Sequence, residues 1–574
     1  MSLELLPNEL LLNLFQYFNI THLFRAFYGL NIHFNKLLFF HFQVRGYFNF
    51  ESISKTHFDI ICQQYLRTLI DHVISIRLSD NNGTPQQINH FLSYGFLFHQ
   101  FTYLKFLSLG YIGSEQIMYN IIIDLQHLHH LTHLKIDKCQ VDDDLINNGW
   151  IFNQIWSLPK LTHCHFERKQ YLWNPFFISP QNISLSIKYL YLEGFCYNSN
   201  ELHRLFEHTI NLENLTIDIE HNYDYQEILF DISSMKKLKI FVQYSPHITN
   251  NLLKNLPNLT HLTIELAHIV IDGYQWEQII NNHLFNLKIF HFKMEFYLRS
   301  NNEKEEQVNQ LLDSFRSQFW IIKHQWYIQC HWYLSNKLYK AYLYTLPYYY
   351  KDFSINSDVQ FKSTCPNHEI HWSYNNVHNL FFIDSINSSV RFPNLYSLKL
   401  HLPFDDSFWS IVPNFNKLIS LNIKLSKIVV SQLPIEKLLQ RAPCLYSLTL
   451  SECLFSYTLL FNLTSSSIRR LCLFEFGCFN EEHCESLIHS SVGIQCEELF
   501  ITVQERNSIV NLVNGMKNLR VLYVRSQDDK WQRNDDDLST EDKLIKWLKD
   551  CLSKSCIIIR GNTNGFDHIQ MWIR

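Results

Sequence analysis

Apolar side chains recur along this 574-residue chain in a six-residue pattern whose first, fourth and sixth positions are apolar. The fourth and sixth positions alternate with period two, which predicts a short strand that carries both side chains on one face. The third and fifth positions then point to the opposite face. Copies begin at residues 73, 104, 131, 161, 187, 212, 259, 287, 395, 418, 445, 468, 496 and 519, and a weaker copy begins at Leu238.

Successive copies are separated by 20 to 30 residues where the pattern is most regular, as between the copies at 187 and 212. This spacing resembles that of leucine-rich repeats, in which the strands of successive repeats stack side by side. The resemblance implies an α/β fold, namely a leucine-rich-repeat solenoid of horseshoe shape. The third and fifth positions of each copy would line its concave face.

The first forty residues show helical spacing instead. Pro7 suits the first position of a helix, and Leu10, Leu11, Leu14 and Phe15 then recur at intervals of three and four. Two further short helices are expected, over about 23–28 and 34–42. Three helices of this size cannot conceal so many leucines and phenylalanines among themselves, so the pattern predicts that they pack on another surface.

The ordered positions Leu6-Pro7-x-Glu9-Leu10-Leu11-x-x-Leu14-Phe15-x-Tyr17-Phe18, followed by Leu23, resemble the start of an F-box over about residues 3–42. The family uses this three-helix unit to dock on the adaptor subunit of a cullin-RING (SCF) ubiquitin ligase. The resemblance assigns adaptor binding to Leu6, Pro7, Leu10, Leu11, Leu14, Phe15 and Leu23. The third helix carries Asn31 and Phe34 where the family usually carries Cys and Trp. The alternative is that these helices only cap the next domain.

Cys139 and Cys453 each stand three residues after a hexamer, as in F-box leucine-rich-repeat proteins. They are expected to be buried turn residues and not reactive thiols.

The expected domains follow from these patterns. They are an F-box-like three-helix domain (1–45), a helical bridge (46–72), leucine-rich repeats (73–292), irregular repeats with an aromatic-rich insertion (293–394), further leucine-rich repeats (395–540) and a carboxyl-terminal cap (541–574). The hexamer register blurs in 293–394, which we interpret as degenerate repeats with a long loop. The alternative is an inserted element that contacts the substrate.

Composition excludes several partners. The chain has 49 basic and 54 acidic residues, a net charge of −5 and no run of five Lys or Arg, so nucleic acid is not expected as a partner. A signal-peptide pattern and an apolar run of membrane-spanning length are both missing, so no membrane association is expected. The 14 cysteines include no Cys-x-x-Cys, which is typical of a reducing compartment and favours the cytoplasm or the nucleus.

Motifs for catalysis are also missing, so we expect no enzyme activity, no catalytic residue, no metal and no cofactor. A zinc site formed by one of two groups of residues stays an alternative, although the spacing of neither group fits a zinc signature. They are His127, His129, His130 and His133, and then Cys330, His331, Cys365, His368 and His371.

The concave face offers Tyr and His side chains, which combine a large contact area with a polar tip. We therefore predict substrate binding by His163, His165, Tyr189, Tyr191 and His261. An ordinary solvated sheet face is the alternative. The sequence as a whole favours a non-catalytic substrate-recognition subunit that binds the ligase adaptor, through it a cullin, and a protein substrate. The alternative function is a leucine-rich-repeat interaction scaffold unrelated to ubiquitin.

Overall fold

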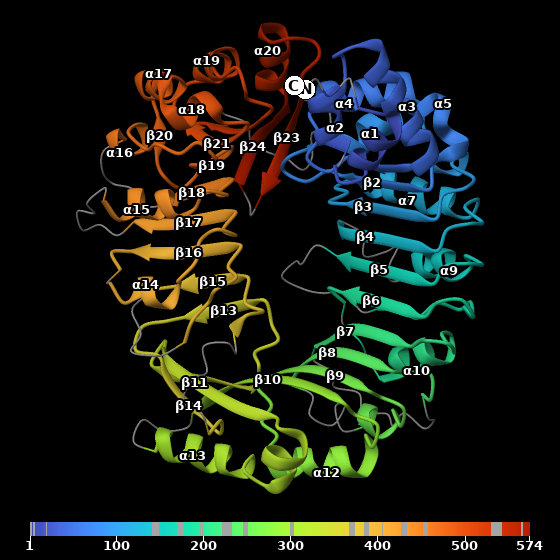
Figure 1. Ribbon diagram of the computed structural model, residues 1–574, viewed down its shortest axis with the longest axis vertical. Helices are drawn as coiled ribbons and strands as arrows, with labels where there is room; N and C mark the ends of the chain where they lie inside the picture. The colour runs from blue at the N-terminus through green and yellow to red at the C-terminus, as the bar shows by residue number, and fades with distance from the viewer. Residues whose placement is uncertain are drawn as a thin grey trace. The chain divides into compact units, whose positions relative to one another are not determined.

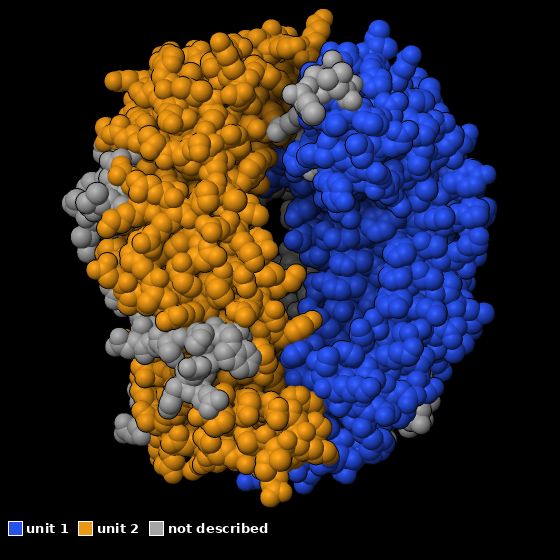
Figure 2. Space-filling view, in the orientation of Figure 1, with its two compact units in different colours: residues 1–296 blue, residues 297–574 orange. Residues whose placement is uncertain are grey.

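The computed structural model forms two compact units, residues 1–296 and 297–574, coloured separately in Figure 2. The part of the chain that it describes comprises residues 3, 6–18, 20–139, 149–168, 177–195, 197, 199–220, 232–244, 251–298, 303–366, 374–383, 390–404, 406–425, 433–451, 457–529, 542–563 and 566–574. Cys453, His368 and His371 lie outside these residues.

The first unit opens with three helices: α1 (Asn8–Phe15), α2 (Ile20–Phe27) and α3 (Ile32–Arg45). Each lies where the spacing predicts a helix, with boundaries that differ by a few residues. Pro7 takes the N-cap position and not the first helical position, since its backbone is still extended (ψ 146°).

Asn31, which departs from the F-box pattern, has a structural role at the start of α3. Its side-chain Oδ1 accepts a hydrogen bond from the Phe34 backbone N–H at 2.9 Å. A helix start leaves such N–H groups without intrahelical partners, and Asn is among the best residues to satisfy one. At the other end of α3, Gly46 adopts a left-handed conformation (φ 63°), and a Cβ there would lie 2.2 Å from the His72 carbonyl oxygen.

The three helices share a phenylalanine core. The ring centroids of Phe15 and Phe27 lie 4.8 Å apart, and those of Phe24 and Phe42 lie 5.7 Å apart. The same core extends into the next segment, because Phe42 lies 5.5 Å from Phe48. The helices therefore bury part of their apolar surface on the start of the following domain.

Residues 46–72 begin with a strand that the spacing does not predict, β1 (Tyr47–Asn49), which pairs parallel with β2 (Ser75–Ser79). The expected helical spacing follows as α4 (Lys55–Ile60), η2 (Ile61–Leu66), α5 (Arg67–Leu69) and η3 (Ile70–His72). The first strand of the stack is thus earlier than predicted.

A parallel sheet occupies the rest of the first unit, with strands in the order of the sequence from β1 to β10 and helices along one side of them (Figure 1). The elements are β2 (Ser75–Ser79), α6 (Gln87–Ser93), η4 (Phe98–Gln100), β3 (Phe106–Gly110), α7 (Glu115–Leu125), β4 (His133–Cys139), α9 (Trp150–Trp156), β5 (His163–Arg168), β6 (Tyr189–Glu193), α10 (Ser199–Glu207), β7 (Asn214–Glu220), β8 (Lys237–Gln243), β9 (His261–Ala267), α12 (Gly273–His283) and β10 (Ile289–Leu298).

The strand register confirms the hexamer interpretation. Leu134 pairs with Cys164, and Cys164 pairs with Leu190, so residues at the fourth position form one column across neighbouring strands. These residues are at most 3% exposed. The weaker copy was assigned the wrong register: Leu238 pairs with Leu215 and therefore occupies the fourth position, not the first.

The second unit begins with α13 (Lys304–Ser314), η5 (Phe319–His324), β11 (Tyr327–Ser335), β12 (Leu338–Leu346), β13 (Asp352–Ile355) and β14 (Gln360–Ser363). β11 pairs antiparallel with β12 on one side and with β14 on the other. The prediction of degenerate repeats was therefore wrong for 327–363, apart from β13. Residues 328–333 are all buried, so the strand shows no single buried face.

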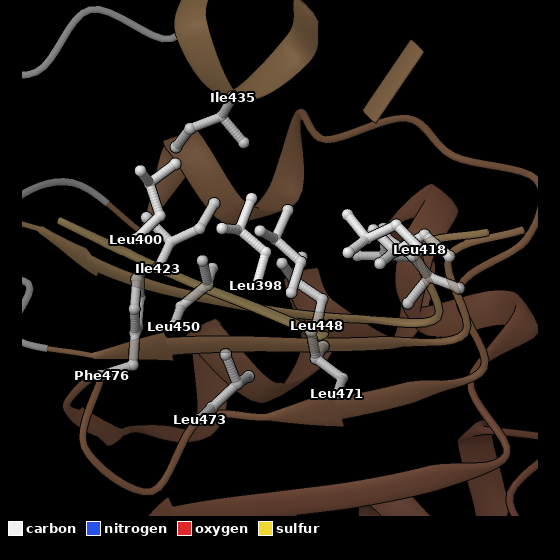
Figure 3. Packing of buried hydrophobic residues seen from close by; sticks show 14 of the residues in the cluster. Leu398, Leu400, Leu418, Ile423, Ile435, Leu448, Leu450, Leu471, Leu473 and Phe476 are labelled. Atoms are coloured by element: carbon white, nitrogen blue, oxygen red, sulfur yellow. The ribbon is translucent and has the colours of Figure 1, made fainter. Parts of the chain in front are cut away.

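Repeats resume at β13, which pairs parallel with β15 (Asn379–Phe382). The following elements are β16 (Ser397–Leu402), α14 (Phe408–Ile411), β17 (Ser420–Leu425), α15 (Leu433–Arg441), β18 (Ser447–Ser451), α16 (Thr458–Phe461), β19 (Arg470–Cys472), β20 (Cys478–Phe479), α17 (Glu481–His489), α18 (Ser491–Gln495), β21 (Glu498–Val503), α19 (Asn507–Gly515) and β22 (Val521–Ser526). Figure 3 shows the buried leucines of this stack, including Leu398, Leu448 and Leu471.

The chain closes with α20 (Lys543–Cys551), β23 (Ile557–Thr563) and β24 (Phe566–Trp572), within the range 541–574 where the sequence predicts a cap. β24 pairs antiparallel with both β22 and β23. This change of direction ends the parallel stack, as a terminal cap must.

Candidate functional site

A Thr-His pair recurs at the start of three strands and fixes the position of each histidine ring. Thr132 Oγ1 lies 3.0 Å from the Lys105 carbonyl oxygen and 2.8 Å from His133 Nδ1. The same carbonyl oxygen accepts the backbone N–H groups of Thr132 and His133, and the tautomer of His133 decides which atom donates in the Thr132–His133 contact. Equivalent contacts occur at Thr162–His163 and Thr260–His261. In all three pairs the contact engages Nδ1 of the histidine.

The electrostatic environment favours the same neutral form. Burial lowers the pKa of His133 and of His163, and the neighbouring His133 lowers the pKa of His163 further. Burial also lowers the pKa of His261, with smaller contributions from Lys237 and Lys288. These three imidazoles are therefore uncharged at neutral pH.

The parallel register stacks aromatic rings into two columns. In the first, His133, His163 and Tyr189 are paired residues of β4, β5 and β6, with ring centroids 4.0 and 4.1 Å apart. In the second, His165 and Tyr191 lie 3.9 Å apart with an angle of 6° between their planes. In-register strands lie about 4.8 Å apart, so flat side chains at equal positions must stack face to face.

These columns line a pocket with a volume of about 360 Å³ on β4 to β7. His163, His165, Tyr189 and Tyr191 all contribute, so the structure brings four of the five predicted substrate-binding residues together. His261 lies apart from them on β9. The pocket also contains residues that the prediction did not include, among them His133, Asn214 and Thr216.

A row of carboxylates runs beside the ring columns, at the position that follows each hexamer. Asp137, Glu167 and Glu193 occupy it on β4, β5 and β6, and Glu167 pairs directly with Glu193. Asp218 and Glu265 continue the row and line a second pocket of about 240 Å³ together with Glu193, Lys239 and Thr216. Thr216 lines both pockets, so they adjoin.

The pKa values of Asp137 and Glu167 shift in opposite directions because the two carboxylates are close together. His165 and then Glu167 and Lys135 hold the pKa of Asp137 far below its usual range. Burial and the neighbouring Asp137 raise the pKa of Glu167 to about 7. Burial and the nearby Glu193 carboxylate raise the pKa of Tyr191 well above its usual value, so its hydroxyl stays protonated.

Asp137, His165 and Glu167 offer three ligand atoms within 4.8 Å of one another, which is compatible with a metal ion. His165 Nε2 lies 3.7 Å from Asp137 Oδ1 and 3.8 Å from Glu167 Oε2. However, Lys135 Nζ already neutralises Asp137 at 3.0 Å. A cation would have to displace this ammonium group, and the expectation of no metal stays a prediction.

The zinc ligands considered from the sequence do not converge where they are described. His133 is held by Thr132, whereas the His130 ring stacks on Tyr103 with centroids 5.9 Å apart. Cys330 is buried, and its burial raises the pKa of the thiol far above the usual value. Cys139 is buried as predicted, and its thiol donates to the Asp137 carbonyl oxygen at 3.3 Å.

The residues predicted to bind the adaptor separate into two groups. Leu11 and Phe15 are 0% exposed and Leu23 is 1% exposed, so their side chains support the helices and cannot touch a partner directly. Leu14 is half-buried. Leu6, Pro7 and Leu10 are exposed. Exposed apolar side chains nearby that the prediction did not include are Tyr17, Phe18, Leu30 and Ile32.

Comparisons with known proteins leave the family open. No protein-family model and no curated protein matches the chain. Among the solved structures that match is a plant peptide hormone receptor, RGFR1, in complex with RGF2, at 10% identity and a TM-score of 0.22. The match covers 79% of this chain and 60% of the receptor chain.

The fold class is defined by the strand pairing instead. In-register parallel strands with buried fourth and sixth positions define a leucine-rich-repeat-like α/β stack. None of the helices in the described part of the chain combines the length and hydropathy that a membrane span requires.

Proposed function

We propose that this protein is a non-catalytic substrate-recognition subunit of a cullin-RING ubiquitin ligase. In this proposal the exposed side chains of α1 to α3 bind the adaptor subunit, and the sheet face of the first unit binds a protein substrate. The adaptor would connect the chain to a cullin in the cytoplasm or the nucleus. The F-box resemblance of residues 3–42 names the partner.

One observation carries the proposal: the amino-terminal helices pack on one another and on the start of the following domain and still leave apolar side chains exposed. Leu10 is 53%, Ile32 75% and Leu30 62% exposed, while the adjacent Leu11 is fully buried. Moving each such side chain from half-exposed to buried contributes about 1 kcal/mol. Several of them together would supply the apolar centre of an interface.

The second candidate is an interaction scaffold without a link to ubiquitin, in which the helices only cap the repeats. The packing of Phe24 on Tyr65 (5.5 Å) and of Phe42 on Phe48 (5.5 Å) favours this function, because it joins the helices to the first repeat. The two candidate functions differ in what they require of the helices. A cap needs only their buried side chains, whereas adaptor binding also needs their exposed apolar side chains.

A double variant, Leu6→Ser with Leu10→Ser, separates the candidates because both side chains are exposed. The matched control is Ile183→Ser with Leu185→Ser, which replaces two apolar residues of the same unit that are 57% and 67% exposed. Each purified full-length variant is tested for co-precipitation with a purified adaptor subunit of SCF ligases. We expect the first variant to lose the adaptor and the control to retain it.

Failure of the unmodified chain to bind the adaptor would exclude the ligase function and favour the scaffold. If both double variants retained the adaptor equally well, Leu6 and Leu10 would not form the interface. Circular dichroism of each variant confirms that the fold is preserved, so that lost binding is not a consequence of unfolding.

A further inference from the structure

The aromatic pocket on β4 to β7 holds its histidines in fixed positions. His133 and His163 each contact the hydroxyl of the preceding threonine through Nδ1, at 2.8 Å. The pKa of each is lowered, chiefly by burial, so both rings are neutral. They therefore carry no charge that would repel a cationic ligand.

The stacked rings of the pocket offer flat faces. The His163–Tyr189 and His165–Tyr191 pairs are close to coplanar stacks, with interplanar angles of 7° and 6°. Aromatic faces attract cations, and a planar guanidinium can lie flat against such a ring while its N–H groups reach acceptors at the edge. A compact ammonium group cannot make both contacts equally well.

The carboxylate row supplies negative charge, which is complementary to a guanidinium. Glu167 and Glu193 are paired residues on neighbouring strands, and like charges placed opposite each other destabilise a sheet. Burial and then the neighbouring Asp137 raise the pKa of Glu167 to about 7, and Glu193 makes a smaller contribution in the same direction. A bound cation beside Tyr191 and Glu193 would relieve this repulsion.

We propose that this pocket binds an arginine side chain from an extended segment of a partner protein. The inference rests on the proposed function as a substrate receptor and names the chemistry of the substrate. The guanidinium would stack on Tyr191, which lines this pocket, and donate to Glu193, which lines the adjoining one. The adjoining pocket beside Asp218 and Glu265 would take a second donor-rich residue of the same segment.

The carboxylate row also opposes a nucleic-acid ligand, because phosphate groups would be repelled from it. Lys135 does not reverse this, since its Nζ is paired with Asp137 at 3.0 Å. The residues that line the aromatic pocket include Lys135, whereas Glu193, Asp218 and Glu265 line the adjoining pocket, so a cationic side chain would place its charge at the boundary between the two.

The test uses the full-length chain and fluorescence anisotropy. The probe is a blocked, fluorescein-labelled Gly-Ser-Arg-Gly-Arg-Ser-Gly peptide, and the controls are the same peptide with citrulline or lysine in place of arginine. Citrulline keeps the shape and removes the charge. We expect the arginine peptide to bind at least tenfold more tightly than the citrulline peptide and measurably more tightly than the lysine peptide.

Variants assign the binding to this pocket. We expect Tyr191→Ala and Glu193→Gln each to weaken binding at least fivefold, and Tyr191→Phe, which keeps the ring, to retain most of it. The matched controls are Tyr274→Ala and Glu115→Gln, which change an exposed tyrosine and an exposed glutamate on helices of the same unit. They are expected to leave binding unchanged.

Equal binding of the arginine and citrulline peptides would overturn the proposal, as would equal effects of the pocket variants and their controls. Equal binding of the lysine peptide would overturn the assignment to arginine and indicate a general attraction for cations. Adaptor binding is measured on the same variants and is expected to be normal. Its loss in the Leu6/Leu10 variant concerns the ligase function alone, so the two proposals fail independently.

Discussion

Leu10 and Leu11 are adjacent residues of α1 with opposite environments, and replacing each by alanine gives the sharpest test of the amino-terminal surface. Leu11 is 0% exposed, whereas Leu10 is 53% exposed. Both substitutions make the same chemical change in the same helix, so differences in helix propensity cancel. Only the packing of the two side chains differs.

The magnitudes follow from burial. Removing a fully buried leucine side chain costs about 3 kcal/mol, because the lost transfer energy is joined by the energy of the cavity left behind. An exposed surface position changes stability by no more than about 0.5 kcal/mol. Since about 1.4 kcal/mol corresponds to a factor of ten, local opening should rise about 100-fold for Leu11→Ala and about twofold for Leu10→Ala.

Hydrogen–deuterium exchange followed by mass spectrometry measures this opening for peptides that cover α1 to α3, without requiring two-state unfolding of the whole chain. We expect faster exchange there for Leu11→Ala and near-normal exchange for Leu10→Ala. Adaptor binding should respond in the opposite way when equal amounts of folded protein are compared. Leu10→Ala should bind the adaptor more weakly than Leu11→Ala, because only Leu10 is exposed to contact it. Similar acceleration by both variants would refute the assignment of Leu10 to an outer surface.

Three further predictions test other parts of the structure. Asn31→Ala should destabilise α3 by about 1 kcal/mol through loss of its cap, seen as faster exchange of the first amides of α3, whereas Asn31→Asp should not. Cys164, whose burial raises its pKa to about 12, should resist iodoacetamide at pH 8 while the exposed Cys444 is alkylated, and equal labelling would contradict its burial. Glu167 has a folded pKa of about 7 against an ordinary value of 4.5, so its protonated form favours folding and that contribution is lost as pH rises between these values. Melting temperature should therefore fall less over this range in Glu167→Gln, and parallel profiles of variant and wild type would refute the assignment.

The repeats show how far local patterns reach. The hexamers predict which residues form the buried columns because their period of two survives in every regular strand. They fail at Leu238, where consecutive alternating apolar residues allow more than one register. They also fail over 328–333, where Ile328, Cys330 and Trp332 still alternate with other residues in the sequence but both strand faces are buried in the structure.

The candidate site shows the same limits. The choice of His163, His165, Tyr189 and Tyr191 depended on their positions in the hexamer and on their residue types, and the structure places them in one pocket. The carboxylates that adjoin it were missed, although the position after the hexamer repeatedly carries an acidic residue, as at Glu167. That signal becomes meaningful only when the strands are known to be in register.

By itself the sequence determined that short strands with one apolar face recur along most of the chain, and that three short helices precede them. It could do so because side-chain direction within a strand or helix depends on local backbone geometry. Only the tertiary structure decided which of two adjacent leucines, Leu10 or Leu11, stays exposed, and that rings and carboxylates from successive strands share one pocket. Those outcomes depend on which distant segments pack against each element, and no local period encodes them.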